Sequence, residues 1–302
     1  MLATMSQHAP SIDFVKSHHR NMTNKSGDGG LDDKSIAFTL GFVAGVEYAR
    51  AARGAAPVKS LKLAPQSDVL FLDMDDCLYT NNWQVAEVIS ANIKKYCVDV
   101  LGLAPDENYK LYKKYGTTLR GLMREHLHLD VDDYMVKAHD ISSVIHLIKP
   151  DLVLKDMLER CKVPAWVFTA ATMDHAHNCL GSLGVLSFFH DRILACTSRD
   201  MGFGSKYEAE SFHLARVAAG PRGLGSADGI GAQGELDPSH CYFADDSPKN
   251  IERAKKCGWH TCLVGKITRG GESNEGFEFA DHVVESVHEL EKIWPHLFAK
   301  KK

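Results

Sequence analysis

The chain has 302 residues, of which 44% are hydrophobic and 25% charged, as is typical of a folded protein with one large or two modest domains. Its formal net charge of -4 gives no electrostatic case for a nucleic acid polymer or a membrane as partner, so we expect a small-molecule partner. The eight cysteines form no Cys-x-x-Cys pair, which predicts free buried thiols. Together with the absence of a secretory signal pattern, this favours a cytoplasmic protein.

Residues 1–62 differ in composition from the rest of the chain and are expected to form an N-terminal extension. A polar, glycine-containing stretch over 21–30 precedes a helical pattern over 32–53. The apolar run of this pattern is too short for a membrane span. We expect an amphipathic helix that docks on a surface or binds a protein partner, or else a plain extension of the fold.

An apolar run over 69–72 ends abruptly at an acidic cluster. Such a run is typical of a central parallel strand, and ligands of open α/β sheets lie at the carboxyl ends of strands, where Asp73 and Asp75 would stand. Two carboxylates this close need a cation, a shared proton or solvent, and Mg²⁺ fits best. Asp73 could then be metal ligand and nucleophile, while Asp75 lends its backbone carbonyl to the metal and its side chain to proton transfer. Acidic strand ends are common, however, so this pair alone does not decide the function.

Residues 81–150 show helical patterns with short breaks and no strand pattern, which predicts an α-helical cap inserted beside the sheet. Within this block, Tyr115 to Leu122 combines aromatic, small, hydroxyl and cationic groups around a glycine break. Tyr115 and Arg120 could therefore contact a substrate and determine specificity. A simple turn between two helices is the alternative interpretation.

The strand pattern resumes over 165–168 and runs into Thr169, whose hydroxyl next to fresh backbone amides suits a phosphate oxygen. Threonine also caps helices, so the signal is weak alone. A shorter strand is expected over 193–196. Beyond it, Lys206 precedes an amphipathic helix, a place where lysines are usually just solvated.

A second apolar strand, over 241–244, ends at the paired acids Asp245 and Asp246. Two acidic strand ends in an alternating strand and helix pattern predict a shared metal site. Further strands are expected over 261–264 and 282–284, which together give a doubly wound parallel sheet. The glycine-rich stretch 220–234 follows no strand, so we expect a mobile surface loop and no dinucleotide fingerprint.

Zinc is disfavoured by the spacing of the histidines. The pairs His126 with His128 and His175 with His177 lack the i, i+4 spacing of two ligands on one helix. We therefore expect these side chains to be solvated or satisfied by hydrogen bonds.

The chemistry-bearing positions form an ordered set along the chain. In order, they are Asp73-x-Asp75, Thr169, Lys206 and Asp245-Asp246. This set resembles the four motifs of the haloacid dehalogenase superfamily of phosphohydrolases. Segments 71–79, 115–122, 148–151 and 243–251 more closely resemble its pyrimidine 5'-nucleotidase-like branch, found in fungi and plants. The resemblance covers about residues 66 to 290.

The resemblance implies a Rossmann-like core formed by 63–80 and 151–302, with the cap at 81–150, and Mg²⁺-dependent hydrolysis of phosphate monoesters. By position, Asp73 would be the nucleophile that becomes an aspartyl-phosphate. Asp75 would protonate the leaving alcohol and then activate water. Asp246 would bind Mg²⁺ directly, and Asp245 would act through water or hydrogen bonds.

The same resemblance would place Thr169, the backbone amide of Ala170, and Lys206 on the phosphoryl oxygens. This chain departs from the branch at three positions. Ala170 replaces the usual asparagine after the threonine, Tyr207 replaces the usual proline after the lysine, and Cys77 stands where many relatives have threonine. Cysteine at position 77 also resembles some fungal members, so Ala170 and Tyr207 are the two changes that leave the substrate and the catalytic efficiency open. The nucleophile, acid, lysine and metal ligands stay in place.

The preferred interpretation is a phosphatase of a small phosphorylated metabolite, most simply a pyrimidine nucleoside 5'-monophosphate. Sugar phosphates and phosphoglycolate remain open as substrates, because a fold does not fix a function. True dehalogenases of the superfamily need neither the second aspartate of the first motif nor a metal, so Asp75 and Asp246 favour a phosphatase. The competing class is a catalytically weakened binding or regulatory protein that keeps the fold.

Overall fold

The structure is a computed structural model that describes residues 67–80, 82–125, 129–139, 144–198, 201–220 and 234–300. These residues all belong to one compact unit, Lys59–Lys302. The N-terminal helix expected over 32–53, most of the glycine-rich stretch, and the pair His126 and His128 lie outside the described residues. Among the helices that are described, none combines the length and the apolar character needed to cross a membrane.

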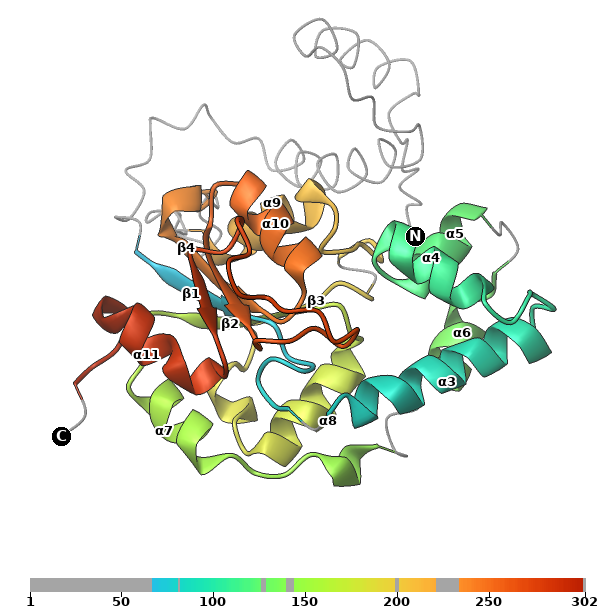
Figure 1. The fold of residues 1–302 in the computed structure, drawn as a ribbon, viewed down its shortest axis with the longest axis horizontal. Helices are drawn as coiled ribbons and strands as arrows, with labels where there is room; N and C mark the ends of the chain where they lie inside the picture. Colours follow the sequence, from blue (N-terminus) through green and yellow to red (C-terminus); the bar gives the residue numbers. More distant parts are fainter. Residues whose placement is uncertain are drawn as a thin grey trace, which may run out of the picture. The chain divides into compact units, whose positions relative to one another are not determined.

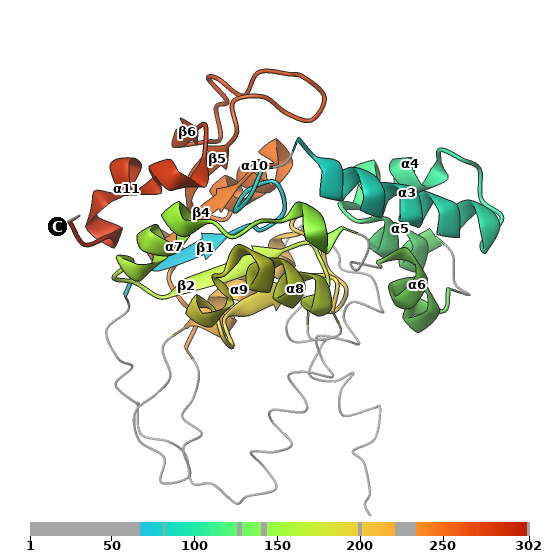
Figure 2. The ribbon, with the colours of Figure 1, turned by 90° about the horizontal axis from the view of Figure 1, so that it is seen from below.

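The described residues contain one parallel sheet in the strand order β3-β2-β1-β4-β5-β6. Strands β1 to β4 are labelled in Figure 1, and β5 and β6 in Figure 2. The strands are β1 (Val69–Leu72), β2 (Ala165–Thr169), β3 (Ile193–Ala195), β4 (Cys241–Asp245), β5 (His260–Val264) and β6 (His282–Val284). The order reverses between β1 and β4, which is the defining feature of a doubly wound sheet. The predicted Rossmann-like α/β fold is confirmed, and each predicted strand lies within about one residue of its observed place.

Helices cover both faces of the sheet (Figures 1 and 2). One face packs against α7 (Leu152–Glu159), α8 (Met173–Leu183) and α11 (Leu290–Ile293), and the other against α9 (Ala209–Ala219) and α10 (Pro248–Lys256). Because successive strand residues point to opposite faces, Leu70 and Leu72 join the first core and Val69 and Phe71 the second. Short 3₁₀ turns connect the elements at η2 (Ile145–Leu147), η3 (Leu186–Phe188), η4 (Pro238–His240), η5 (Val287–Glu289) and η6 (Pro295–Leu297).

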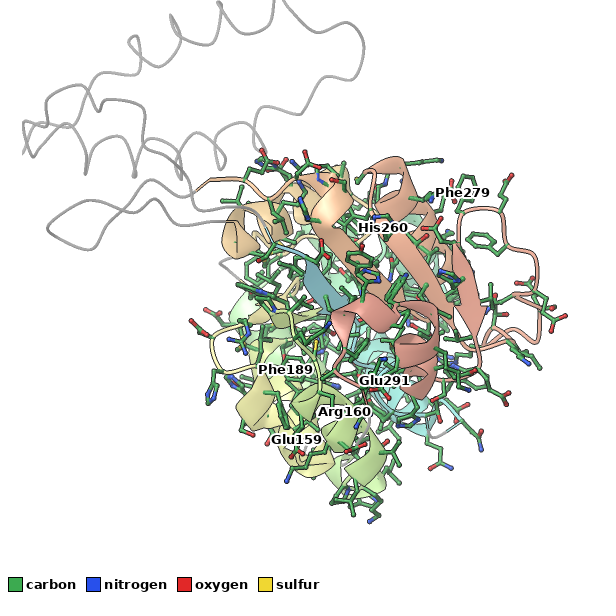
Figure 3. All side chains as sticks on the ribbon, turned by 90° about the vertical axis from the view of Figure 1, so that its left-hand side faces the viewer. Glu159, Arg160, Phe189, His260, Phe279 and Glu291 are labelled. Atoms are coloured by element: carbon green, nitrogen blue, oxygen red, sulfur yellow. The ribbon has the colours of Figure 1, made fainter. Side chains whose placement is uncertain are left out.

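The two cores are closed in different ways. On the α9 and α10 face, Phe71 and Phe212 pack against the buried Trp259, with ring centroids 4.7 and 5.0 Å away. On the other face, an ion pair joins α7 to α11 (Figure 3). Arg160 Nε donates to Oε1 of Glu291 at 3.0 Å and Arg160 Nη2 donates to Oε2 at 2.6 Å, and this pair of parallel hydrogen bonds is the strong form of a salt bridge. Aromatic packing thus holds one face of the sheet, and an ion pair ties two covering helices together on the other.

The helical block predicted over 81–150 contains α3 (Gln84–Asp99), α4 (Glu107–Tyr115), α5 (Thr118–Glu125) and α6 (Val131–Ala138), which we call the cap. The cap has a hydrophobic core of its own. Its buried members include Tyr96, Leu111, Leu119, Leu122 and Tyr134. Because this core is separate from the two cores of the sheet, the cap is packed as a helical layer of its own.

Candidate active site

The register of the sheet brings the two acidic strand ends side by side. Leu72 of β1 pairs with Ala244 of β4, so Asp73 stands level with Asp245. The backbone N–H of Asp73 donates to the carbonyl of Ala244 at 2.9 Å and holds this alignment past the end of β1. The two acids therefore meet where the strand order reverses, the place at which open α/β sheets bind ligands.

Lys206 lies between these two acids. Its ammonium donates to Asp73 Oδ1, to Asp245 Oδ2 at 2.6 Å and to the carbonyl of Phe168 at 3.1 Å. The side chain is only 2% exposed. Burial would lower the pKa of this lysine, but the two carboxylates raise it above its usual value. Lys206 is therefore a fixed cation with all three of its N–H groups in use.

The residues fit a hard divalent cation. Carboxylate oxygens of Asp73, Asp245 and Asp246 lie within 4.8 Å of one another. Burial raises the pKa of Asp73 to about 8 although Lys206 opposes it, and burial followed by the charge of Asp245 raises the pKa of Asp246 well above its usual value. When ionised, three carboxylates against one lysine leave two negative charges. An all-oxygen donor set with this excess charge is what Mg²⁺ prefers.

The three acids are not held equally. Asp245 is fully buried, and its Oδ1 accepts hydrogen bonds from the backbone N–H of Ser247 at 2.8 Å and from Asn250 Nδ2 at 3.0 Å. In the described part of the chain, no hydrogen bond or ion pair engages Asp246. The carboxylate of Asp246 is therefore the freer of the two to bind a cation.

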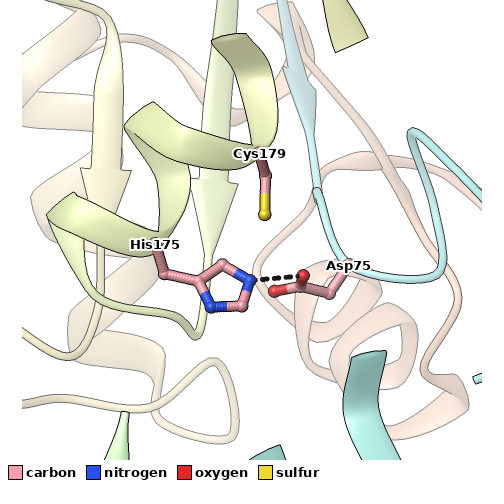
Figure 4. A group of neighbouring side chains, drawn as sticks. All are labelled: Asp75, His175 and Cys179. Carbon is pink, nitrogen blue, oxygen red and sulfur yellow. Dashed lines mark hydrogen bonds and ion pairs between the residues drawn. The ribbon is translucent and has the colours of Figure 1, made fainter. Parts of the chain in front are cut away.

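Asp75 stands two residues beyond Asp73 in a different environment (Figure 4). Its Oδ1 accepts from the hydroxyl of Tyr79 at 2.5 Å and pairs with Nε2 of His175 at 2.8 Å. Burial would raise the pKa of Asp75, but His175 and then Tyr79 hold it below its usual value. Among the described residues, no donor reaches Oδ2, and 29% of the side chain is exposed. One oxygen is thus held by the protein and the other is available for proton transfer.

The side chain of His175 reaches Asp75 because of how α8 begins. The hydroxyl of Thr172 caps the helix by accepting from the backbone N–H of His175 at 3.1 Å, which fixes the first turn after β2. The second ring nitrogen, Nδ1, is buried with no partner in the described residues. The hydrogen bond to Asp75 is therefore the polar contact that orients this ring.

The expected phosphate-binding residues end the neighbouring strand. Thr169 is buried at the end of β2, and its Oγ1 accepts from the backbone N–H of Ala171 at 3.1 Å. The carbonyl of Ala170 accepts from the hydroxyl of Thr197 at 2.7 Å. The residue before Thr169 supplies the carbonyl that Lys206 contacts. Thr169 and Lys206 thus lie next to the same strand end, beside the acids of β1 and β4.

Tyr115 and Arg120 of the cap lie outside the acidic cluster, and their polar groups already have partners. The hydroxyl of Tyr115 donates to Glu125 at 2.7 Å, within the cap. Arg120 Nη2 donates to Glu208 at 3.0 Å, and Arg124 donates to the same oxygen at 3.0 Å. Glu208 lies two residues after Lys206, so Arg120 connects the cap to the segment that carries this lysine.

The α4–α5 turn contacts the same segment through its backbone. Gly116 has φ +84°, and a Cβ placed on it would lie 1.9 Å from the hydroxyl oxygen of Ser205 and 2.9 Å from the ring of Tyr207. Lys249 adds a hydrogen bond to the carbonyl of Lys113 at 3.2 Å. The interhelical turn is thus also the point at which the cap meets the core.

The sequence patterns did not identify every residue of the site. His175 and Tyr79 were not expected to hold Asp75, and Asn250 was not expected to hold Asp245. A signal was present for a different pair: His175 and Cys179 are four residues apart, which places both on one face of α8. The spacing of the histidines alone does not reveal this pair, because its second member is a cysteine.

No family model matches the chain. It is 25% identical over 208 residues to phosphate metabolism protein 8 of Saccharomyces cerevisiae, a match that covers 64% of this chain and 60% of the yeast protein. Among solved structures, it is similar to a hydrolase from Pseudomonas syringae, with 19% identity, a TM-score of 0.48 and coverage of 78% of this chain and 100% of that one. It is also similar to L-2-haloacid dehalogenase from Xanthobacter autotrophicus, with 13% identity, a TM-score of 0.46 and coverage of 75% of this chain and 98% of that one. The function proposed below depends on the geometry of this chain's own site.

Proposed function

We propose that this protein is a Mg²⁺-dependent phosphatase of small phosphate monoesters that works through an aspartyl-phosphate on Asp73. One observation carries the proposal: Lys206 bridges Asp73 and Asp245, while Asp75, two residues on, keeps one carboxylate oxygen available. Phosphoryl transfer needs positioning and charge neutralisation at the phosphoryl group, with a proton donor for the leaving oxygen. The ordered motifs of the sequence support the same chemistry.

In the first half-reaction, a carboxylate oxygen of Asp73 attacks phosphorus as the bond from phosphorus to the ester oxygen breaks. The departing oxygen takes a proton from Asp75. Both donors to Asp75 reach Oδ1, so the transferable proton is carried by Oδ2. The products of this step are the free alcohol and Asp73 as a mixed anhydride with phosphate.

In the second half-reaction, the ionised Asp75 takes a proton from water while the water oxygen attacks phosphorus. The bond between phosphorus and Asp73 breaks, which releases inorganic phosphate and restores the Asp73 carboxylate. Asp75 regains its proton in this step and is ready to act again as an acid. The hydrogen bonds of Tyr79 and His175 keep its side chain in place throughout.

Lys206 and Thr169 are proposed to hold the phosphoryl oxygens, together with the backbone amide of Ala170. All three N–H groups of Lys206 are used within the protein. When Asp73 becomes bonded to phosphorus, its hydrogen bond with Lys206 is released, and that N–H can turn to a phosphoryl oxygen.

The implied cation would be held by Asp73, Asp246 and the backbone carbonyl of Asp75, with Asp245 behind them. Bound there, Mg²⁺ supplies positive charge to the phosphoryl oxygens and to the acidic cluster. The protein's own contribution is the placement of these oxygens at the ends of β1 and β4.

For the substrate, we propose a nucleoside 5'-monophosphate with a pyrimidine base. The support comes from the motifs shared with the 5'-nucleotidase-like branch, and Tyr115 and Arg120 are proposed to act in substrate choice. To do so, these two side chains would have to exchange their contacts with Glu125 and Glu208 for contacts with the substrate. A sugar phosphate or phosphoglycolate is the alternative, because Ala170 and Tyr207 depart from the branch.

The test is hydrolysis of a generic aryl phosphate by the purified full chain, with Mg²⁺ and with a chelator. We expect turnover that requires the metal and returns when Mg²⁺ is restored. A protein that only binds ligands or regulates a partner would show no metal-dependent turnover, and that result would refute the proposal. A panel of nucleotides, sugar phosphates and phosphoglycolate, compared by kcat/KM, then identifies the substrate class.

A further inference from the structure

A second group of metal-ligating side chains lies beside the proposed active site (Figure 4). His175 and Cys179 are one turn apart on α8, and both face Asp75 on the loop that follows β1. Their ligand atoms and a carboxylate oxygen of Asp75 all lie within 4.8 Å of one another. Spacing of i, i+4 on a helix is the arrangement by which two side chains ligate one metal ion.

We propose that Asp75, His175 and Cys179 form a second metal site, selective for a zinc-class divalent cation. One nitrogen, one thiolate and one carboxylate are ligands that Zn²⁺ accepts and that Mg²⁺ does not favour. The neighbouring cluster of Asp73, Asp245 and Asp246 offers oxygen ligands alone. Each cluster contains one acid of the loop after β1, and the two clusters differ in the metal chemistry they support.

The rearrangement that zinc requires is small. Tetrahedral zinc ligands lie about 3.3 to 3.6 Å apart, as follows from zinc bond lengths of roughly 2.0 to 2.3 Å. His175 Nε2 and Asp75 Oδ1, now 2.8 Å apart, would separate by about half an ångström, and the sulfur of Cys179 already lies within 4.8 Å of the other ligand atoms. The two residues of α8 are buried, whereas Asp75 is partly exposed, so the cation would enter from the side of Asp75.

Binding changes what Asp75 can do. The cation replaces the proton shared by His175 and Asp75 and displaces the thiol proton of Cys179, so protons are released to solvent. A carboxylate bound to zinc is a poor proton donor and a poor base. Zinc would therefore inhibit turnover by binding the carboxylate of Asp75, and not by binding the atoms that are proposed to hold Mg²⁺. This consequence, unlike the binding itself, rests on the proposed phosphatase function.

Cobalt(II) tests the binding directly, because a thiolate ligand gives a thiolate-to-cobalt charge-transfer absorption that an all-oxygen site cannot give. The full chain is titrated with Co²⁺ in the presence of excess Mg²⁺. We expect the absorption to saturate at one equivalent in the wild-type protein and to be absent in Cys179→Ala and Cys179→Ser. Cys161→Ala is the matched control: Cys161 is a partly buried free thiol that donates to the carbonyl of Val163, so this variant should keep the absorption.

Inhibition is measured in parallel, on the same variants, with Zn²⁺ and an aryl phosphate. We expect Cys179→Ala to keep its basal turnover and to need at least about tenfold more Zn²⁺ for half inhibition.

An absence of the charge-transfer band in wild type, or its persistence in both Cys179 variants with normal circular dichroism, would overturn the site. Saturation of the band without loss of turnover would overturn the inhibitory role. A band in a protein that hydrolyses no phosphate ester would uphold the metal site and refute the phosphatase proposal.

Discussion

Asp73 and Asp75 are two residues apart on one loop, yet their surroundings shift their pKa values in opposite directions. Asp73 is buried beside two other acids and one lysine, and burial raises its pKa to about 8. Asp75 is partly exposed and receives two donors on one oxygen, and His175 holds its pKa below the usual value. In the absence of a cation, the proposed nucleophile is therefore the acid that ionises less readily.

This difference bears on the role of the proposed cation. A divalent ion held beside Asp73 would lower the pKa of that carboxyl and favour its ionised, nucleophilic form, whereas a phosphate dianion beside Asp75 would raise the pKa of this second carboxyl and favour its acid form. The two ligands of the proposed reaction would thus reverse the order of the two pKa values. In that proposal, Asp73 is ionised and Asp75 protonated only when both ligands are bound.

We expect Asp73→Asn to have the largest effect, because it removes the proposed nucleophile and leaves Asp75 in place. An amide has nearly the same shape as the carboxylate but is a poor nucleophile and a poor metal ligand, so we expect turnover to fall by at least roughly 10³-fold. Initial rates with an aryl phosphate measure the loss, and circular dichroism checks the fold. More than a few per cent of wild-type activity in a folded variant would show that Asp73 is not the nucleophile.

Asp75→Asn should be nearly as damaging, in a way that depends on the leaving group. Loss of general acid catalysis costs about 10²- to 10⁴-fold for alkyl phosphates, and less for aryl phosphates whose leaving oxygen needs no proton. Comparing kcat for the two ester classes separates this role from a structural one. Equal losses for both classes would contradict the assignment of Asp75 as the acid.

Asp246→Asn and Asp245→Asn form a matched pair that tests which of the two acids binds the cation directly and which only supports the site. Asp246 has no hydrogen bond among the described residues, whereas Asp245 is held by Lys206 and Asn250. We expect Asp246→Asn to raise the Mg²⁺ concentration for half-maximal activity far more than Asp245→Asn, because losing a direct ligand weakens binding more than losing a supporting partner. Magnesium titrations of both variants decide this, and superimposable curves would remove the distinction.

The smallest and most selective effect is expected in the cap. If Tyr115 and Arg120 contact the variable part of the substrate, Tyr115→Ala and Arg120→Ala should lower kcat/KM for the preferred substrate and leave a small aryl phosphate nearly unaffected. Arg124→Ala is the control, because Arg124 binds the same oxygen of Glu208. A uniform loss for every ester, shared by the Arg120 and Arg124 variants, would make Arg120 a structural link between cap and core.

The fold could be predicted from the sequence because its strands are short apolar runs that end in polar residues. β1 and β4 end at Asp73 and Asp245, and parallel strands bring such ends to one edge, so these acids could be placed together before the structure was known. Lys206 could be placed there only through the family resemblance. In chain order alone, Lys206 is a lysine before a helix. The loop after β3 places its side chain against Asp73, which lies 133 residues earlier in the chain.

The remaining contacts depend on tertiary packing that no local pattern encodes. The imidazole of His175 meets Asp75 across 100 residues, because the packing of α8 on the sheet turns this face of the helix towards β1. Arg120 meets Glu208 across 88 residues in the same manner. The segment around Arg120 was expected to be either a ligand contact or a plain turn, whereas it is a turn that also joins two parts of the molecule.

Gly116 gives that junction an unusual sensitivity. Its hydrogen atom occupies the space in which any side chain would meet Ser205 and Tyr207, next to the lysine of the site. A single methyl group there would act as a steric wedge between cap and core, and the left-handed backbone of this residue would add strain. The contact between cap and core thus depends on the missing side chain at this position, and a substitution of Gly116 is a way to push the two parts of the protein apart.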